Sequence, residues 1–504
     1  MKNLKFSLFA VFLVCLTIAA AGQSVNLKNL GKKAVSSTEK SIDKKVDKTV
    51  DKTVDNAKNT AEDKAEKAVE NTAGNLSGQG SQNSQATSGT VPQASGKTLY
   101  VSKQNGNNKN DGSKATPLKN LDKAILIAEP GTTIFIAGGI EMGTLNVGFI
   151  ESDKPVKIYG SYDEGFTKQD MIAHPTLIQP DNESARSTRK AIMKFTKNVS
   201  GTVIDHLVFD GGQRNAYHVK EGIVEGIEGG RLLPETEKPP VGYPTISEPL
   251  LQFVSATGGG DVTIQNCLFV NGASFALQAG HRSGKFTVQN NVFVGNKMAA
   301  IEIYGTCAST GGPNTLSLCG DVEIVNNTIL FTWSRVKDFL DMGYGVRVMT
   351  KCNYNIHNNI IGASILAGVD HTRFNKNEWV KVDNNIFFVN KDKDLHYSPA
   401  SNTRLRIDAG DFGDLEIASA SGNRNEIPKD LKVNKAYLDG YLNARYSEQT
   451  DLDRNSSANQ WRSMMGMNLQ GTMSSKVTMF CNKYPWKDAL NLFGNVSGFG
   501  AQNQ

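Results

Sequence analysis

Five short stretches of the chain share one arrangement of apolar and polar positions. In each, an apolar residue precedes one or two asparagines, and a second apolar run follows: IQNCLFVNG (264–272), VQNNVFVGN (288–296), IVNNTILF (324–331), IHNNIIGA (356–363) and VDNNIFFVN (382–390). Aligning them on one asparagine each gives intervals of 25, 36, 32 and 26 residues, with the aligned positions at Asn266, Asn291, Asn327, Asn359 and Asn385. Such intervals predict a solenoid, because stacked units share a core that one unit cannot bury alone.

The recurring asparagine is expected to lie at a bend of each unit. Stacked carboxamides can bond from one coil to the next, so the pattern predicts an internal amide ladder. An earlier segment, VIDHLVFDGG (203–212), fits the same pattern with His206 in the asparagine position. We therefore interpret His206 as a bend residue and not as a catalytic group.

A second strand is expected after each asparagine, and it carries a polar residue directly after an apolar one. Side chains alternate along a strand, so the apolar residue points inward and the polar residue outward. The outward residues are Gln252, Gln278, Glu302, Arg347 and Asp370. On consecutive coils they would form one column at about 4.8 Å per step. This column is either an opposite-charge ladder, worth about 0.2–1 kcal/mol per pair, or the floor of a ligand groove.

The start of the repeat region resembles a known family. A strand in TLYVSKQ leads to a helix with one apolar face, a stop at Glu129-Pro130-Gly131 and the strand TTIFIAG; the helix face comprises Leu121, Ala124, Ile125 and Ala128. This stretch and VKIYGSYDEGFTKQD (156–170) resemble the first coils of right-handed parallel β-helix proteins of the pectate-lyase-like superfamily. The resemblance covers roughly residues 97–410. It implies an all-β solenoid, a single-stranded right-handed parallel β-helix with an N-terminal capping helix.

The resemblance is specific for the fold and weak for activity, because the superfamily holds lyases, hydrolases, adhesins and proteins of no known activity. In active relatives a glycan groove runs along such a sheet face. A lyase of acidic glycans would then neutralise the uronate with cationic side chains and abstract a proton with a base. The catalytic candidates are Arg347, His371, Lys351 and Tyr217, with His218 as a further base. The substrate-binding candidates are Gln252, Gln278, Glu302, Asp370, Arg373, Arg214 and His281.

Two other chemistries are considered for the same residues. A glycosidase needs two carboxylates, and Glu302 and Asp370 lie two coils, or about 10 Å, apart. Arg347 between them favours both staying ionised, which suits a general acid poorly. No carboxylate cluster of the kind many pectate lyases use for calcium is evident, so no cofactor is expected, although Ca²⁺ stays an open alternative. The family's catalytic residues do not map onto this chain one by one.

The remaining segments differ in composition from the repeats. The predicted organisation is a signal peptide (1–22), a charged helical stalk (23–72), a flexible Ser/Gly/Gln linker (73–96), the β-helix (97–410) and a partly helical C-terminal cap or tail (411–504). KSIDKKVDKTVDKTVD within the stalk repeats every four residues, so residues 25–72 are a candidate for self-association. Three helices are expected after 411, one with a capping box at Ser457 and Gln460.

The signal peptide, the composition and the cysteines bear on where the protein acts and on its partners. The 504 residues are 39% hydrophobic and carry a net charge of +5 without a basic run, so nucleic acid is not expected as a partner. The signal predicts export to the periplasm, the outer surface or the medium. Cys307 and Cys319 bracket a Gly- and Pro-bearing loop and are the predicted disulfide. The partners of Cys267, Cys352 and Cys481 stay open.

Two functions follow from these observations. The first is an exported envelope or surface protein that binds polysaccharide along the outer face of one sheet. The expected polysaccharide is acidic, because Arg347, Lys351 and Arg373 could pair with its carboxylates. The alternative is a polysaccharide lyase that cleaves a uronate-containing glycan by β-elimination. The sequence alone does not separate them.

Overall fold

The computed structural model describes most of the chain after residue 95. The described ranges are 96–143, 149–179, 191–197, 199–211, 249–254, 259–272, 274–309, 316–333, 342–400, 403–445, 456–469 and 483–503. The predicted signal peptide, stalk and linker lie outside these ranges, as do Arg214, Tyr217, His218 and Cys481. None of the described helices is both long and apolar enough to cross a membrane.

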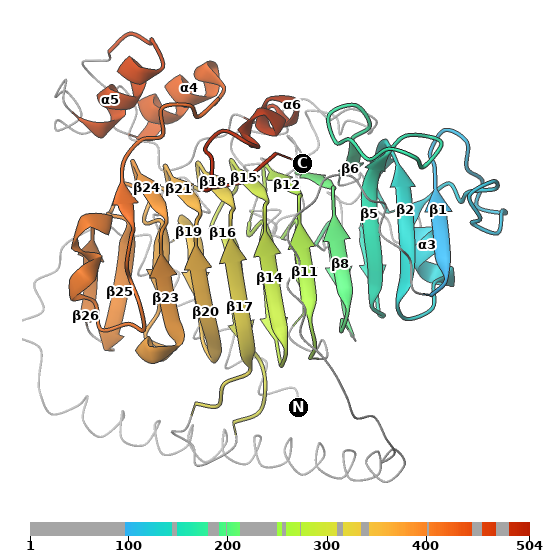
Figure 1. Cartoon of the computed structure of the whole chain (residues 1–504), viewed down its shortest axis with the longest axis horizontal. Helices are drawn as coiled ribbons and strands as arrows, with labels where there is room; N and C mark the ends of the chain where they lie inside the picture. The colour runs from blue at the N-terminus through green and yellow to red at the C-terminus, as the bar shows by residue number, and fades with distance from the viewer. Residues whose placement is uncertain are drawn as a thin grey trace, which may run out of the picture. The chain divides into compact units, whose positions relative to one another are not determined.

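Within the described residues, the chain forms three sheets of nine strands each, and it visits them in turn (Figure 1). Sheet 1 contains β1 (Thr98–Val101), β2 (Thr132–Ala137), β5 (Val156–Tyr162), β8 (Thr202–Asp205), β11 (Val262–Gln265), β14 (Lys285–Gln289), β17 (Gly320–Val325), β20 (Cys352–His357) and β23 (Val380–Asp383). Sheet 2 contains β3 (Gly139–Glu141), β6 (Thr176–Ile178), β9 (Val208–Asp210), β12 (Leu268–Val270), β15 (Val292–Val294), β18 (Thr328–Leu330), β21 (Ile360–Gly362), β24 (Ile386–Phe388) and β27 (Arg424–Asn425). Sheet 3 contains β4 (Ile150–Ser152), β7 (Met193–Phe195), β10 (Leu251–Phe253), β13 (Leu277–His281), β16 (Ala299–Gly305), β19 (Tyr344–Val348), β22 (Val369–His371), β25 (Leu395–Ala400) and β26 (Thr403–Ile407).

Neighbouring strands pair in parallel throughout these sheets, except for the antiparallel hairpin of β25 and β26. Each passage through sheets 1, 2 and 3 is therefore one coil, and the described region is a parallel β-helix, as the sequence predicted. The helical segments are α3 (Leu121–Ile127), η4 (Asn377–Trp379), η5 (Ala409–Asp414), α4 (Lys435–Arg445), α5 (Ser457–Met464), α6 (Trp486–Ala489) and η7 (Leu490–Leu492).

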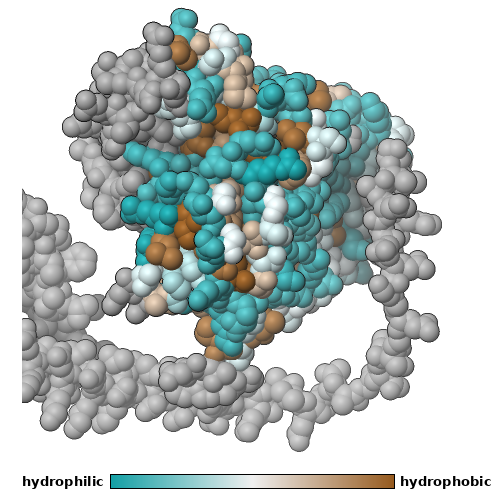
Figure 2. All heavy atoms as spheres, turned by 60° about the vertical axis from the view of Figure 1, so that its left-hand side comes forward, coloured by the Kyte–Doolittle hydropathy of each residue, from teal (hydrophilic) through white to brown (hydrophobic). Residues whose placement is uncertain are grey.

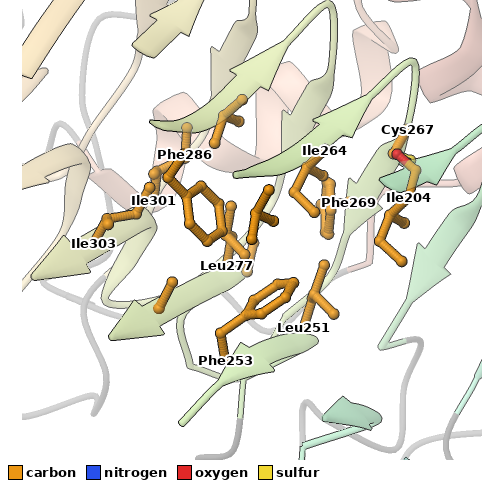
Figure 3. Close-up of a cluster of buried hydrophobic side chains, with 14 of the residues drawn as sticks. Ile204, Leu251, Phe253, Ile264, Cys267, Phe269, Leu277, Phe286, Ile301 and Ile303 are labelled. Carbon is orange, nitrogen blue, oxygen red and sulfur yellow. The ribbon is translucent and has the colours of Figure 1, made fainter. Parts of the chain in front are cut away.

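The core fills the space between the three sheets because each strand directs alternate apolar side chains inward. Figure 3 shows Leu277 and Phe253 of sheet 3 facing Ile264 and Phe286 of sheet 1, with Phe269 of sheet 2 beside them. Like residues stack from coil to coil. The rings of Phe209 and Phe269 lie 4.7 Å apart at an angle of 1°. Such offset-stacked rings add to the burial of their apolar area.

The amide ladder is present, and one position in its predicted alignment is wrong. The ladder residues are Asn291, Asn327, Asn359, Asn385 and Asn423, each accepting from the asparagine or cysteine one coil earlier. Asn266 is not among them. Cys267 takes the ladder position in its coil, and its backbone N–H donates to Asn291 Oδ1 at 2.9 Å. The first interval is therefore 24 residues.

Asn266 occupies instead the position directly before the ladder residue of its coil, where the chain turns from sheet 1 to sheet 2. These residues have left-handed backbone angles between φ 51° and 55° and comprise His206, Asn266, Asn290, Asn326, Asn358 and Asn384. Asparagine is common at such angles because its short polar side chain tolerates them. His206 shares the conformation, with φ 51°, which confirms it as a bend residue.

The N-terminal end of the solenoid is closed by α3. The predicted apolar face of this helix, Leu121, Ala124, Ile125 and Ala128, is buried in the main core. At the C-terminal end, Ala409 and Phe412 of η5 enter the same core, and Phe412 packs against Phe387 at 5.5 Å between ring centres. Irregular 3₁₀ structure therefore caps the last coil.

Of the predicted cap or tail, the later helices form a tail along the coils and do not cover the last coil. They lie along the outer face of sheet 2 and form a second apolar cluster with it, which we call the strap (residues 431–445, 456–469 and 483–503). Trp461 is 1% exposed and stacks on Phe331 at 5.6 Å. Ser456 caps α5 by accepting from the N–H of Asn459, so the predicted capping position at Ser457 was one residue late.

Candidate functional site

The strand register of sheet 3 brings five predicted residues side by side. Gln252, Gln278, Glu302, Arg347 and Asp370 are direct neighbours on consecutive strands, and we call them the polar column. The column continues beyond them. Lys194 pairs with Gln252, and His396 pairs with Asp370. Sequence reasoning missed both, although Lys194 follows Met193 in the same apolar-polar order.

The side chains of the polar column are bonded to one another in a chain. Gln252 Nε2 donates to Gln278 Oε1 at 3.1 Å, and Gln278 Nε2 donates to Glu302 Oε1 at 2.9 Å. Arg347 donates from Nη1 to Glu302 Oε2 at 2.6 Å and from Nε to Asp370 Oδ2 at 3.1 Å. Both carboxylates are almost fully buried, with 5% and 3% exposure. One guanidinium therefore holds two carboxylates of neighbouring coils, a geometry that stabilises the sheet.

A hollow of about 450 Å³ lies over the C-terminal part of the column. Its lining consists of Tyr344, Arg347, Asp370, Thr372, Arg373, Phe374, Ser398, Ala400, Thr403 and Arg404. Figure 2, in which the C-terminal coils are turned forward, shows hydrophilic side chains over much of this side of the molecule, with scattered hydrophobic ones. The hollow thus combines cationic, hydroxyl and aromatic groups.

Arg404 is the lining residue that sequence reasoning missed. Its Nη2 donates to Asp370 Oδ1 at 2.9 Å and to the Tyr344 hydroxyl at 2.7 Å. The guanidinium carbon also lies 5.8 Å from the centre of the Tyr344 ring. Arg404 comes from β26, the antiparallel strand outside the repeat, so no repeat position could have indicated it. Burial and the nearby Asp370 raise the pKa of Tyr344 to about 12.

Arg373 lines the same hollow at its open side. Its guanidinium carbon lies 4.8 Å from the centre of the Phe374 ring. Phe374 is 53% exposed, so this arginine–aromatic pair faces solvent. The planar guanidinium of Arg373 therefore lies on an aromatic face at the surface of the hollow.

Three predicted site residues lie elsewhere. His371, a predicted catalytic residue, ends β22, pairs with Val348 and Tyr397, and is 1% exposed. Burial lowers its pKa to about 4. A side chain enclosed in this way cannot reach a ligand on the outer face.

His281 and Lys351 are also directed away from the column. His281 ends β13, is 3% exposed, and its Nε2 lies 3.0 Å from the carbonyl oxygen of Gly284. Its pKa is lowered by burial. Lys351 lies beyond β19, where its Nζ donates to the carbonyl of Cys307 at 3.0 Å.

The predicted disulfide is confirmed. Cys307 and Cys319 are bonded, with their Cα atoms 5.4 Å apart. Cys267 and Cys352 are free thiols inside the solenoid, and burial raises the pKa of Cys352 to about 12. Among the described residues, no group of three or more His, Cys, Asp or Glu side chains is arranged to hold a metal ion.

The three sheets define the chain as a parallel β-helix protein. More particularly, residues 104–163 match the model of a family described as "Protein of unknown function (DUF1565)". No curated protein matches the sequence.

Several solved structures are similar to the chain at low identity. Pectate lyase Pel9A is 12% identical with a TM-score of 0.38, over 76% of this chain and 89% of that one. A rhamnogalacturonan lyase is 12% identical with a TM-score of 0.29, over 81% and 100%. A mutant of the PL6 family alginate lyase AlyGC is 13% identical with a TM-score of 0.32, over 68% and 39%. These likenesses concern the fold.

Proposed function

We propose that the protein binds an acidic polysaccharide along the outer face of sheet 3. The observation that carries this proposal is the charge of the hollow. Three guanidinium groups, those of Arg347, Arg373 and Arg404, line it together with one carboxylate, that of Asp370. With Glu302, which pairs with Arg347 from below, the group carries a net charge of +1, counted as three positive and two negative side chains.

Guanidinium groups suit the carboxylates of uronate sugars because they offer paired N–H donors in one plane. Arg347 is held by Glu302 and Asp370 and would act as a fixed cation. Arg404 and Arg373 are the groups that can meet the ligand. Toward the N-terminal coils, the amides of Gln252 and Gln278 extend the polar face, which suits the hydroxyl groups of further sugar rings.

The alternative, β-elimination, needs a base near the bound uronate. Tyr344 is the phenol that lines the hollow, but its pKa of about 12 keeps it protonated at neutral pH. His371 is enclosed in the core. Among the described residues, neither candidate is thus placed and ionised to act as the base, and Tyr217 and His218 lie outside the described ranges. Ultraviolet absorbance of unsaturated products from a uronate polymer would reveal the lyase.

The experiment compares Arg373→Gln and Arg404→Gln with wild type, using polygalacturonate and a neutral glucan. Arg406→Gln is the matched control, because Arg406 lies on the same strand as Arg404, pairs with Asp392 and does not line the hollow. We expect both test variants to bind polygalacturonate about tenfold more weakly, and high salt to weaken wild-type binding by screening. Equal affinity of all proteins for both polymers would refute the proposal.

We further propose that the protein is exported. A disulfide of this kind persists in oxidising compartments, so the Cys307–Cys319 bond supports a location outside the cytoplasm. Mass spectrometry of the protein from the native host should find an N-terminus near residue 23. Detection of the uncleaved chain in the cytoplasm would contradict export.

A further inference from the structure

A second hollow, of about 350 Å³, lies at the N-terminal end of the solenoid. It is built from the end of β2, the start of β3, the loop between β5 and β6, and α6 of the strap. The polar and aromatic residues of its lining include Gln104, Glu164, His174, Trp486 and Lys487. None of these residues belongs to sheet 3, so this hollow is separate from the one over the polar column.

The floor of this hollow is bare backbone held in place from two sides. The N–H of Gly138 donates to the carbonyl of Tyr162, and the N–H of Gly139 donates to the carbonyl of Pro175, both at 2.9 Å. A Cβ atom at Gly138 would come within 2.9 Å of the backbone of His174. Glycine therefore lets two coils approach here and leaves an open floor where other residues would place a side chain.

The walls carry partly exposed polar groups that do not use all of their hydrogen-bonding atoms within the described residues. Glu164 accepts from Ser102 Oγ at 2.6 Å and from Asn105 Nδ2 at 2.9 Å, and both bonds fall on Oε2. Those two bonds fix the carboxylate and leave Oε1 available. The imidazole of His174, the indole N–H of Trp486 and the side-chain amide of Gln104 also make no hydrogen bond within the described ranges. The polar column differs, because its groups bond one another.

Trp486 supplies an aromatic wall with a defined orientation. Part of its ring packs against the apolar cluster of sheet 2, and it is half-buried. The Lys487 ammonium lies 5.5 Å from the ring centre. The indole provides an apolar surface, and the side chains of Glu164, His174 and Gln104 beside it provide directional polar contacts. Small-ligand sites combine these two kinds of contact.

We propose that this hollow binds a neutral saccharide of one or two rings. Sugar hydroxyls both donate and accept hydrogen bonds, so they can satisfy Glu164 Oε1, His174 and Gln104 together. The C–H face of a pyranose packs on the indole of Trp486. The carboxylate of Glu164 and the ammonium of Lys487 cancel in charge, which favours a neutral ligand. The volume lies at the lower end of the range for small-molecule pockets.

The test titrates the purified exported protein with a panel of neutral mono- and disaccharides, followed by calorimetry and tryptophan fluorescence. We expect at least one saccharide to bind with a Kd of about 1 mM and to shift the emission spectrum. Glu164→Gln should weaken binding about tenfold, because an amide nitrogen can replace the free acceptor oxygen. Trp486→Phe should remove the fluorescence response while keeping an apolar side chain against the strap.

Glu378→Gln is the matched control, because Glu378 is exposed on η4 and lies outside the hollow. It should bind the saccharide as wild type does. Polygalacturonate binding should be unchanged in Glu164→Gln, so the result is independent of the function proposed for sheet 3. The proposal is overturned if no neutral saccharide binds the folded wild-type protein, or if binding is equal in wild type, Glu164→Gln and Trp486→Phe.

Discussion

Replacing Asn327 by leucine tests the amide ladder at its centre. Asn327 is fully buried, and its Oδ1 accepts from both the backbone N–H and the Nδ2 of Asn291 at 3.0 Å. Its own Nδ2 donates to the carbonyls of Val288 and Val325 and to Asn359 Oδ1, at 2.9, 3.0 and 3.0 Å. Leucine has a similar shape and can make none of these bonds.

The magnitude follows from the groups that lose a partner. Two buried donors of Asn291 are orphaned, and each costs about 1–3 kcal/mol, so the loss is about 2–6 kcal/mol. Burial of the leucine side chain offsets about 1–2 kcal/mol of this. The two ranges together span about 0–5 kcal/mol, and we expect the free energy of unfolding to fall by about 2.5 kcal/mol, the difference of their midpoints.

Equilibrium denaturation in urea, followed by circular dichroism and by tryptophan fluorescence, measures this change. Asn353→Leu is the matched control in sheet 1. Asn353 makes a side-chain bond with Asp321 that is exposed to solvent, so its replacement should cost under about 0.5 kcal/mol. Equal stability of Asn327→Leu and the control would refute the ladder as a source of stability.

Three further predictions concern other parts of the solenoid. Burial lowers the pKa of His371 from 6.5 to about 4, so the unfolded chain binds a proton more readily and the fold loses stability as the pH falls from about 6.5 toward 4. His371→Leu should therefore show a smaller fall in melting temperature over this pH range. Parallel curves of melting temperature against pH for wild type and variant would contradict this. Arg347→Met leaves Glu302 and Asp370 without their shared donor and should lower the free energy of unfolding in urea by about 2–4 kcal/mol; an unchanged midpoint would show that the ion pairs contribute nothing. Trp461→Ala should cost about 3–5 kcal/mol and expose apolar surface to a hydrophobic dye, whereas a protein as stable as wild type would argue against the strap as a packed layer.

The features that the sequence predicted best are those set by the alternation of side chains within strands, which repeats from coil to coil. Alternation within strands placed Glu302, Arg347 and Asp370 in one column, and the register agrees. The same alternation would have turned His371 inward, since it lies two residues after the inward Val369. His371 is a catalytic candidate by its side-chain chemistry, but its place in the strand already directs it into the core.

Other features lay beyond what the repeat could indicate. Most repeats contain two adjacent asparagines, so the sequence does not show which of the two forms the ladder. The coil with Asn266-Cys267 has one asparagine, and aligning on it placed the ladder at Asn266, whereas Cys267 holds that position. Arg404 entered the hollow through a hairpin that reverses the strand direction. The second hollow joins Glu164 to Trp486, which is distant in sequence, so only tertiary packing brings them together.

The strap has a consequence for the order in which the protein can fold. Tyr484 exchanges hydrogen bonds with Asn271, Ala501 donates to Thr328 and Gln502 donates to Asn290, across sequence separations of 213, 173 and 212 residues. Coils of a repeat protein otherwise contact only their neighbours and can form one after another as the chain emerges. Here the outer face of sheet 2 is covered only when the C-terminal residues of the strap have been added and have packed on it. A chain that crosses a membrane from its N-terminus would therefore carry an uncovered apolar face until its transport is complete, and any premature stop would leave that face open to aggregation.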